Sequence, residues 1–553
     1  MSIDIKLILS PDAEPITREV DEGTSIEEVV QNYRSKLPYR IMCATVDNRD
    51  ESLNYAIRRP CEIRLCDIRT NTANRVFQRS ISLLYLAAAK SVLGSDEVEI
   101  LNSINRGLYT VVKEKITDEQ VESIEKKMWD LIDANFPIKT TSVKKNDLLE
   151  FIKSSGADRQ YELFRNAPDM HFISLCDLDG YVNYFYGVMV PSTGYIERFA
   201  IQRYHDGILL RYPTPDAPND LPQYYSDDKV YETFEEEREY EEANHLSFIS
   251  EINEQIEQGR SGEIIAEAER KHTDRITEIA KAIKDSGKRM VLIAGPSSSG
   301  KTTFSNRLIA RLEDFGVRSL YTGTDDYFVD REFTPRDAKG EYDYEGLDAM
   351  DVPLFARNIN DLLSGKEVDM PEYDFIEGRK KFGKRTEKLG ESQIIVIEGI
   401  HALNGAMSEG ISEDVKFKIY ISPLTQLSID DHNRIPVSDV RLMRRILRDN
   451  RTRGNSVFET IHSWPKVRTG EIVNILPYNA EADMVFNSTL IYELPVIKKY
   501  VQPLLEDISK DHAEFGYAEW LLYLLTFFRA IEDEDSIPRD SILREFIGGG
   551  LVG

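Results

Sequence analysis

The sequence predicts an α/β protein, with a parallel sheet flanked by helices in its C-terminal half and smaller α+β units in its N-terminal half. After residue 288, short apolar segments alternate with helical segments, as in a parallel sheet built from βαβ units. A glycine-containing loop follows the first of these apolar segments directly. At the N-terminus, alternating apolar residues typical of a strand precede a helix. These three observations set the fold class.

Length and charge limit the classes of function. A chain of 553 residues exceeds what one hydrophobic core usually supports, so we expect two to four domains. With 96 acidic and 69 basic residues, the formal net charge of -27 disfavours nucleic-acid binding by charge alone. The most apolar stretch, 520–528, is too short to cross a bilayer, and the four cysteines form no CxxC pair. We therefore expect a cytoplasmic protein without a membrane partner.

The first 70 residues read as a small α+β unit. Ile3 to Leu9 alternates as a strand does, and a turn at 21–23 leads into a helix that starts at Thr24 and Ser25. Glu27 and Glu28 lie in the first turn of this helix, where acidic residues are favourable. We predict a domain over 1–70.

A second unit is predicted over 71–230. A long helix is expected from about Asn74 to Val92, and another from Asp118 towards Ala134. The segments 172–186 and 196–212 are typical of hairpin-forming strands. The Pro-rich run that follows, 212–222, indicates a domain boundary.

Between the halves, residues 231–285 read as a helical connector. The acidic run 235–242 favours an exposed helix face over a docking site. The remaining residues, 286–553, are predicted to form the α/β domain together with C-terminal helices. The helical segment 511–530 has enough apolar residues to pack against the same chain or a partner subunit. The expected strands of its parallel sheet are Met290 to Ala294, Ser319 to Tyr321, Ile394 to Ile397 and Phe417 to Ile421.

The loop after the first of these strands fits the pattern GxxxxGK[ST] and precedes a helix from Thr303 to Leu312. In this pattern, backbone N–H groups face phosphates, the lysine reaches the β- and γ-phosphates, and the hydroxyl binds Mg²⁺. An ordinary glycine turn is the alternative, which the flanking strand and helix disfavour. The fold is therefore of the P-loop NTPase type. We expect ATP to bind at Gly295, Pro296, Ser297, Ser298, Ser299, Gly300, Lys301, Thr302 and Thr303.

Acidic residues follow two other predicted strands. Glu398 ends the strand 394–397 and should lie beside the phosphates, so we assign it to Mg²⁺ together with Thr302; a solvated strand end is the alternative. Asp325 and Asp326 follow another strand and are candidates for the base that takes a hydroxyl proton, with a helix cap as the alternative.

An arginine-rich segment follows over 441–453. Helical spacing places Arg441, Arg445 and Arg448 on one face. Phosphoryl transfer needs compensating positive charge, which arginines on a closing lid supply while they exclude water. A surface helix paired with nearby acids is the alternative.

With these motifs in place, residues from about 288 to 500 resemble the uridine kinase and phosphoribulokinase family, in particular its uridine-cytidine kinase branch. The resemblance rests on the phosphate loop and on five further segments. These are Thr324 to Phe328, which is similar to the family's DSFY, Asp348 to Asp351, similar to its DAFD, Pro371 to Phe375, Ile397 to Ile400, and the lid from Arg441 to Gly454.

The resemblance implies roles for individual residues. It makes Asp325 the general base, with Lys301, Arg445 and Arg448 as the other catalytic residues, and it adds Arg453 to the ATP contacts. The acceptor would be contacted by residues that stand at the family's substrate positions. These are Asp325, Tyr327, Tyr344, Glu345, Tyr373 and Arg448.

Three departures from the family's pattern concern the acceptor and the lid. Gly378 stands where uridine kinases carry a histidine that reads the pyrimidine, Glu345 replaces an aspartate that contacts ribose, and Asn455 replaces a lid arginine. The resemblance thus implies a kinase, while the acceptor could be uridine, another nucleoside, or a different alcohol or sugar phosphate.

The N-terminal half is similar to the ubiquitin-like TGS module and the second additional domain of threonyl-tRNA synthetase. Gly23 to Ser25 matches the first module, and the matches to the second are Ser103 to Tyr109, Thr117 to Glu125 and Val190 to Gly194. In that synthetase domain two histidines, a cysteine and a further histidine form the editing site. At those positions this chain has Ile81, Tyr85, Phe185 and Met189, which can neither bind metal nor activate water.

The combined interpretation is an ATP- and Mg²⁺-dependent kinase that phosphorylates the 5′-hydroxyl of uridine or cytidine. One alternative keeps the chemistry with another small alcohol or a sugar phosphate as acceptor. A second alternative is a nucleotide-gated RNA-binding regulator that uses the synthetase-like half, although the net charge disfavours nucleic acid. For that half we favour scaffolding or ligand gating, and a homo-oligomer remains open.

Overall fold

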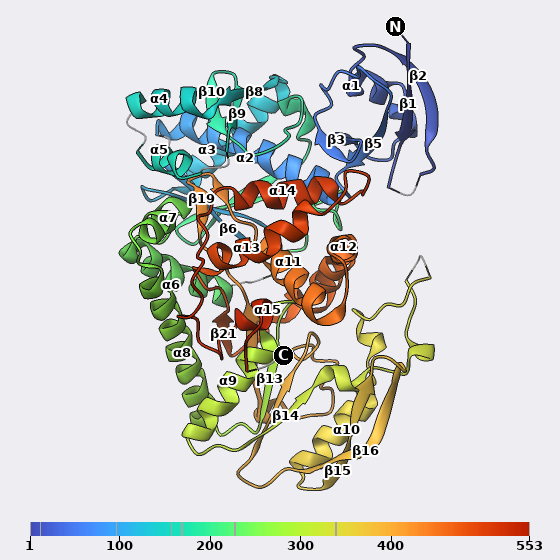
Figure 1. Ribbon diagram of the computed structural model, residues 1–553, viewed down its shortest axis with the longest axis vertical. Coiled ribbons are helices and arrows are strands. Elements are labelled where there is room, and N and C mark those ends of the chain that lie inside the picture. Colours follow the sequence, from blue (N-terminus) through green and yellow to red (C-terminus); the bar gives the residue numbers. More distant parts are fainter. Residues whose placement is uncertain are drawn as a thin grey trace.

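A computed structural model describes residues 2–11, 13–95, 97–155, 158–167, 170–225, 228–337 and 340–551 (Figure 1). The chain forms one elongated molecule, with the N-terminal sheets at one end and the P-loop sheet and its hairpin toward the other. No helix among the described residues is long and apolar enough to cross a membrane.

The first unit is a mixed five-stranded sheet with order β2-β1-β5-β3-β4, in which β1 and β5 run parallel. The helix α1 (Ile26–Gln31) begins at Ser25, whose hydroxyl and Glu28 form a capping box, as the sequence indicated. The strands are β1 (Ser2–Ile8), β2 (Ile16–Asp21), β3 (Ile41–Val46), β4 (Arg49–Glu51) and β5 (Cys61–Asp67).

The second unit packs helices on two antiparallel sheets with orders β11-β12-β7-β6 and β10-β9-β8. Both long helices predicted here are confirmed, and both predicted segments 172–186 and 196–212 contain hairpins. The helices are α2 (Asn71–Leu93), α3 (Asp118–Asp133), α4 (Lys145–Ser155) and α5 (Asp158–Arg165). The strands are β6 (Val98–Ile104), β7 (Gly107–Val112), β8 (Ile138–Lys144), β9 (Phe172–Leu178), β10 (Tyr181–Tyr184), β11 (Ala200–Tyr204) and β12 (Gly207–Arg211).

The connector consists of three helices, α6 (Asp228–Asn244), α7 (Ile249–Glu257) and α8 (Ser261–Ser286). Its helical character agrees with the sequence pattern. The expected exposed face is interrupted, however, because Glu241 within the acidic run is 3% exposed. Gly287 ends α8 in the left-handed conformation, and β13 begins three residues later.

The C-terminal half contains a five-stranded, fully parallel sheet with order β14-β17-β13-β18-β21. In the central strand, Val291 and Ile293 face a core shared with α8 and α9, while Met290 and Leu292 face a core shared with α6 and α10. The strands are β13 (Met290–Ala294), β14 (Ser319–Gly323), β17 (Ile394–Glu398), β18 (Lys416–Ser422) and β21 (Met484–Asn487), and the flanking helices are α9 (Lys301–Asp314) and α10 (Val352–Leu363).

Two smaller pairs of strands extend this half. β15 (Glu367–Asp374) and β16 (Arg379–Lys388) form an antiparallel hairpin beside α10 at the lower end of Figure 1. β19 (Ser428–Asp430) and β20 (Asn433–Arg434) form a short pair near the N-terminal half.

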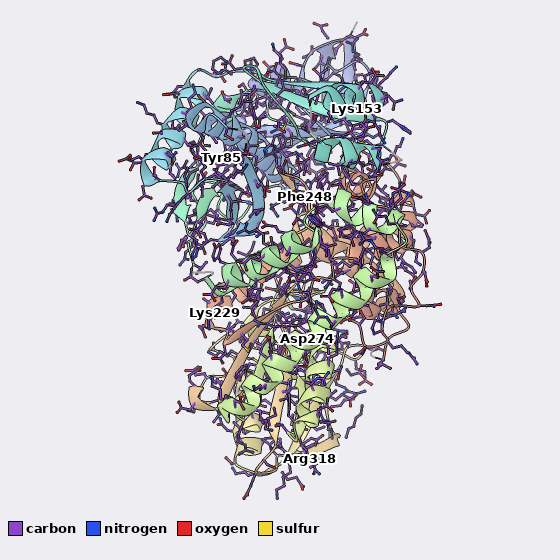
Figure 2. All side chains as sticks on the ribbon, turned by 90° about the vertical axis from the view of Figure 1, so that its left-hand side faces the viewer. Tyr85, Lys153, Lys229, Phe248, Asp274 and Arg318 are labelled. Atoms are coloured by element: carbon purple, nitrogen blue, oxygen red, sulfur yellow. The ribbon has the colours of Figure 1, made fainter. Side chains whose placement is uncertain are left out.

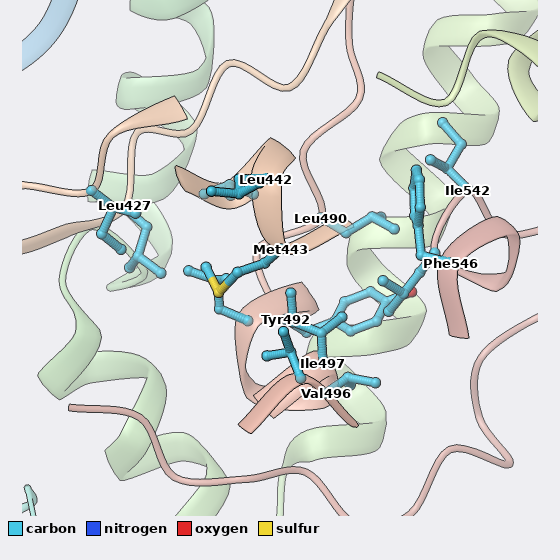
Figure 3. Close-up of a cluster of buried hydrophobic side chains, with 14 of the residues drawn as sticks. Leu427, Leu442, Met443, Leu490, Tyr492, Val496, Ile497, Ile542 and Phe546 are labelled. Atoms are coloured by element: carbon cyan, nitrogen blue, oxygen red, sulfur yellow. The ribbon is translucent and has the colours of Figure 1, made fainter. Parts of the chain in front are cut away.

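The remaining helices form a cluster at the carboxyl edge of the sheet. They are α11 (Val437–Arg448), α12 (Val457–Asn474), α13 (Glu493–Glu506), α14 (Phe515–Leu525) and α15 (Arg544–Ile547), and a π-helical turn over 449–453 follows α11. Figure 3 shows side chains from α11, α13 and the C-terminal segment packed together, among them Met443, Ile497 and Phe546.

The helix α14 is shorter than the apolar segment 511–530 suggested, and it is buried against its own chain. It also joins the two halves. The Tyr517 hydroxyl and the Trp520 ring N–H donate to the two oxygens of Asp439 on α11 at 2.8 and 2.7 Å, while Arg75 of α2 lies 4.6 Å from the centre of the Tyr517 ring. The kinase-like half and the N-terminal half therefore share a buried contact.

Candidate active site

The loop 295–300 connects β13 to α9 at the carboxyl edge of the parallel sheet. A Cβ at Gly295 would lie 2.0 Å from the backbone oxygen of Ile421, so the close approach of β18 requires glycine there. Gly300 has a φ of +85°, a conformation that glycine adopts without strain. The loop therefore has the tight curl that presents backbone N–H groups to phosphates.

The loop offers an ammonium group and two hydroxyls that could bind a ligand. The Lys301 ammonium donates to the backbone oxygens of Gly295 and Pro296 at 2.9 and 3.1 Å, so it lies folded over the loop. The hydroxyls of Ser298 and Ser299 are buried and have no hydrogen-bond partner among the described residues. Burial lowers the pKa of Lys301, which the negative charge of Glu398 partly offsets.

A carboxylate and a hydroxyl meet beside the loop. Thr302 Oγ1 donates to Glu398 Oε1 at 2.8 Å, and the Tyr321 hydroxyl on β14 donates to the same oxygen at 2.8 Å. The other carboxylate oxygen, Oε2, is buried without a partner in the described structure. One carboxylate and one hydroxyl, completed by phosphate oxygens and water, suit Mg²⁺. The residues present thus fit the metal, and Tyr321 orients its carboxylate.

The structure separates the two aspartates that the sequence left as alternatives. The Asp325 side chain is exposed beside the phosphate loop, and crowding by the surrounding protein raises its pKa to about 6 with help from the negative charge of Glu398, while Lys301 acts in the opposite direction. Asp326 instead accepts the backbone N–H of Tyr373 at 3.4 Å and so fixes the hairpin strand β15. Asp325 is the carboxylate close to the phosphate loop.

The predicted arginine face divides into structural and site residues. Arg441 is buried and paired with Glu471, and its Nε also donates to the backbone oxygen of Ser297 at 3.0 Å. The neighbouring Arg444 is likewise buried against Glu493. Because α11 is buried on most of its surface, Arg441 supports the phosphate loop from behind and is not part of an exposed lid.

The other arginines converge on one buried carboxylate. Arg445, Arg448 and Arg453 approach Asp449 at 3.2, 3.0 and 3.4 Å, and Asp449 is 1% exposed. Arg445 also donates to the hydroxyl of Ser297 in the phosphate loop at 2.8 Å. The structure therefore brings these three predicted arginines together around a residue that sequence reasoning did not single out.

The acceptor side contains Glu345, Tyr344 and Tyr373. Burial raises the pKa of Glu345 to about 7, with Arg445 acting in the opposite direction. The Tyr344 hydroxyl accepts a hydrogen bond from Arg331 Nε at 3.3 Å. Tyr373 packs edge-on against Phe328, as does Tyr344. Tyr344 and Tyr373 therefore belong to one aromatic cluster around Phe328, whereas Glu345 lies near Arg445.

The structure adds detail on two residues that the sequence interpretation named for the acceptor. The structure does not bring Tyr327 to this group: its side chain is fully buried against Phe355, where it presents no surface to a ligand. Gly378 has a φ of +71°, and a Cβ there would lie 2.8 Å from the side chain of Arg331. Arg331 thus fills the space beside the position at which the family carries its histidine.

Two further residues, His401 and Glu545, escaped sequence reasoning. His401 is completely buried, and both of its ring nitrogens lack hydrogen-bond partners among the described residues; burial lowers its pKa to about 4, while Asp343 acts in the opposite direction. His401 stands three residues after Glu398, and its place just beyond the end of that strand was the sequence signal that could have identified it.

Thr303, which was expected to contact ATP, donates a hydrogen bond to Glu545 Oε2 at 2.9 Å. No local sequence signal points to this distant partner.

A phosphate loop at the carboxyl edge of a parallel sheet, with a hydroxyl–carboxylate pair, a nearby aspartate and converging arginines, is the arrangement typical of a P-loop kinase. Residues 290–493 match the sequence profile of the Phosphoribulokinase / Uridine kinase family. Uridine kinase of Deinococcus deserti is 31% identical over 194 residues, which are 35% of this chain and 84% of the relative. The chain belongs to this family.

Two other comparisons also gave similar proteins. Uridine kinase of Lactobacillus helveticus is 30% identical over 172 residues, which cover 31% of this chain and 72% of that protein. A solved structure described as a possible uridine kinase from Bacillus stearothermophilus is 23% identical, with a TM-score of 0.25, and the match covers 38% of this chain and 97% of that one.

Proposed function

We propose that this protein is an ATP- and Mg²⁺-dependent kinase that phosphorylates the 5′-hydroxyl of a nucleoside, uridine or cytidine. The observation that carries the proposal is the position of Asp325, which lies within the field of Lys301 and Glu398 and has a pKa raised to about 6. The relatives named uridine kinase support the choice of acceptor.

In the proposed reaction the acceptor oxygen forms a bond to the γ-phosphorus of ATP, the bond from that phosphorus to the leaving ADP oxygen breaks, and Asp325 takes the hydroxyl proton. Lys301, Arg445 and Arg448 supply positive charge for the transferring group. Mg²⁺, held by Thr302 and Glu398, would neutralise the charge that develops on the phosphates. Tyr344, Glu345 and Tyr373 would hold the acceptor.

A panel assay tests the proposal. ATP consumption by the purified full-length protein is measured with nucleosides, sugar phosphates and free alcohols, and Asp325→Asn is compared with the adjacent Asp326→Asn. We expect turnover with uridine or cytidine that falls roughly 10²- to 10⁴-fold in Asp325→Asn and changes little in Asp326→Asn. Full activity of Asp325→Asn would refute the role of Asp325.

A second candidate keeps the mechanism and changes the acceptor to another small alcohol or a sugar phosphate. Arg331 favours it, because its guanidinium lies beside Tyr344 next to Gly378, where no side chain can read a pyrimidine. An arginine at this place suits an anionic acceptor. Turnover in the panel with a sugar phosphate, lost in Arg331→Ala, would select this candidate.

For the N-terminal half we propose a TGS-like module over 1–70 and a second module over 71–230. The second module is similar to the editing domain of threonyl-tRNA synthetase. We propose that this half serves as a scaffold or a ligand gate. Ile81, Tyr85, Phe185 and Met189 all lie buried in one apolar core, which supports the loss of editing chemistry. The hydroxyls of Tyr85 and Thr110 are 2.7 Å apart and satisfy each other. The connector over 231–285 would join this half to a kinase domain over 286–553, and a homo-oligomer is compatible with the proposal.

A further inference from the structure

A C-terminal segment of the chain, residues 540–551, packs on the phosphate loop. It contains the short helix α15 and lies outside the residues that match the kinase family. A Cβ at Gly300 would lie 2.5 Å from Cγ2 of Ile542, so the Ile542 side chain packs directly on the glycine that ends the loop. Figure 3 shows Ile542 and Phe546 of this segment within the buried cluster around α11 and α13. The segment is therefore part of the surroundings of the phosphate loop.

The backbone of this C-terminal segment is anchored to the rest of the domain. In Figure 2, α8 lies on the face toward the viewer, where its Asp274 is labelled. On the same helix, Glu269 accepts a hydrogen bond from the Tyr492 hydroxyl at 2.7 Å, and that hydroxyl lies 3.4 Å from the hydroxyl of Ser541. Phe546 is 1% exposed and lies in the same core as Tyr492. A polar side chain of the segment can therefore move while its backbone stays in place.

The carboxylate of Glu545 in this segment is bonded to the helix that follows the phosphate loop. Thr303 lies in the first turn of α9, where N–H groups without partners inside the helix attract anions. Its Oγ1 donates to Glu545 Oε2 at 2.9 Å. Thr303 is 4% exposed, whereas Glu545 is partly exposed. Glu545 can therefore be displaced from the solvent side, which would free the Thr303 hydroxyl for another anion.

The charge of Glu545 also acts on the positive groups around the loop. Burial lowers the pKa of Lys301, and Glu545 contributes one of the negative charges that oppose this shift. Burial likewise lowers the pKa of Arg453, and Glu545 again contributes to the opposing charge. In the turn 449–453, Arg451 Nη2 donates to the backbone oxygen of Glu545 at 2.7 Å. Glu545 thus contacts both α9 and the arginine-rich turn, and its charge offsets part of the positive charge there.

We propose that Glu545 is an inhibitory anion at the nucleotide site, which the triphosphate of ATP displaces from Thr303 when it binds. A carboxylate and a phosphate oxygen both accept from a hydroxyl, so the two compete for the same donor. Like charges a few ångströms apart also repel each other, even in water. The C-terminal segment therefore lowers the affinity of the site for ATP. This inference rests on the proposed function, in which ATP binds at the phosphate loop.

Direct binding of a nucleotide tests the inference without any acceptor. Isothermal titration calorimetry measures the Kd of the full-length protein for AMP-PNP, a non-hydrolysable ATP analogue, in the presence of Mg²⁺. Glu545→Gln removes the charge and keeps the shape of the side chain, so its Kd should be roughly three- to tenfold lower than that of the unaltered protein. Asp540→Asn removes a charge from the same segment that is paired with Arg307 at 3.7 Å, and as the matched control it should leave the Kd unchanged.

The direction of the change decides the outcome, because a damaged fold does not increase affinity. An unchanged Kd in Glu545→Gln would overturn the inference. A higher Kd would also overturn it, since the carboxylate would then support the nucleotide, for example by accepting a ribose hydroxyl. An equal gain of affinity in Asp540→Asn would reduce the effect to the net charge of an acidic protein and contradict the inference as well.

Two further variants keep the test decisive. If Lys301→Ala weakens the binding of AMP-PNP while Glu545→Gln leaves it unchanged, the inference fails alone. If Lys301→Ala leaves the binding unchanged, the phosphate loop is not the nucleotide site, and the proposed function fails together with the inference. If Glu545→Gln does not fold by circular dichroism, Glu545→Asp replaces it. Its shorter side chain draws the carboxylate away from Thr303, so the Kd should fall by a smaller factor, and an unchanged Kd would refute the inference.

Discussion

The two halves of the chain treat ionisable side chains in opposite ways. At the edge of the parallel sheet, the charge of Glu398 lies close enough to Lys301 and Asp325 to raise the pKa of both. Around α2, the positions that resemble an editing site are filled by buried, uncharged side chains such as Ile81 and Tyr85. Crowding charges costs folding free energy. These two groups of positions therefore differ in the folding cost that they carry, which is high beside the phosphate loop and low around α2.

The largest expected effect tests the charged region. Lys301→Ala removes the ammonium that folds over the phosphate loop, and kcat should fall roughly 10²- to 10³-fold. A coupled ATP-consumption assay measures it, with Lys281→Ala on the exposed surface of α8 as control. If Lys301→Ala remained as active as the control, the phosphate loop would not be the reaction site.

The second prediction concerns pH. A base must be deprotonated to accept a proton, so with a pKa of about 6 for Asp325, kcat/KM should be level above pH 6 and fall about tenfold per unit below it. A carboxyl with the ordinary pKa of 3.8 would keep the rate level down to about pH 4. The profile is measured between pH 4.5 and 8, with circular dichroism at each pH to verify folding. A rate that is level throughout would exclude Asp325 as the base with this pKa.

The third prediction sharpens the role of Asp449. Asp449→Asn removes the carboxylate on which Arg445, Arg448 and Arg453 converge, so the arginines should spread apart. We expect kcat/KM to fall roughly tenfold and the free energy of unfolding to fall by about 3 kcal/mol. Asp449→Glu keeps the charge and should recover part of both quantities. Loss of stability with full activity would make Asp449 a purely structural residue.

The smallest effect is expected in the uncharged region. Tyr85→Phe removes the hydroxyl that pairs with Thr110, which should lower the free energy of unfolding by about 1 kcal/mol and leave kcat unchanged. Chemical denaturation and the ATP-consumption assay measure the two quantities. Hydrolysis of aminoacyl-tRNA by the unaltered protein would show that the comparison between the halves is wrong.

Local patterns predicted much of this architecture from the sequence. The strand Met290–Ala294 was predicted with the bounds that the structure shows. The helix after the phosphate loop is longer than its predicted range by two residues at each end. Both predictions came close because apolar periodicity and the GxxxxGK[ST] motif are local signals. The helix α3 was predicted for the same reason, and the structure shows Thr117 as its cap.

What the sequence did not show depends on distant contacts. Arg441 shares the helical spacing of Arg445, yet its partner Glu471 lies on another helix, so periodicity could not reveal that it is buried. Glu545 reaches Thr303 across 242 residues of chain. Tyr327 stands two residues after Asp325, yet its side chain is buried in the core, where it packs against Phe355.

The helix α8 gives the molecule a stiff axis. Its 26 residues span about 39 Å at 1.5 Å per residue. One side of it lines a cavity of about 690 Å³ between α6 and α8. Its C-terminal end is followed within three residues by the strand β13, which leads into the phosphate loop. A tilt at one end of a stiff helix displaces its other end. A small rotation of the connector would therefore move the strand β13 and the phosphate loop that follows it, without any change in the residues of that loop.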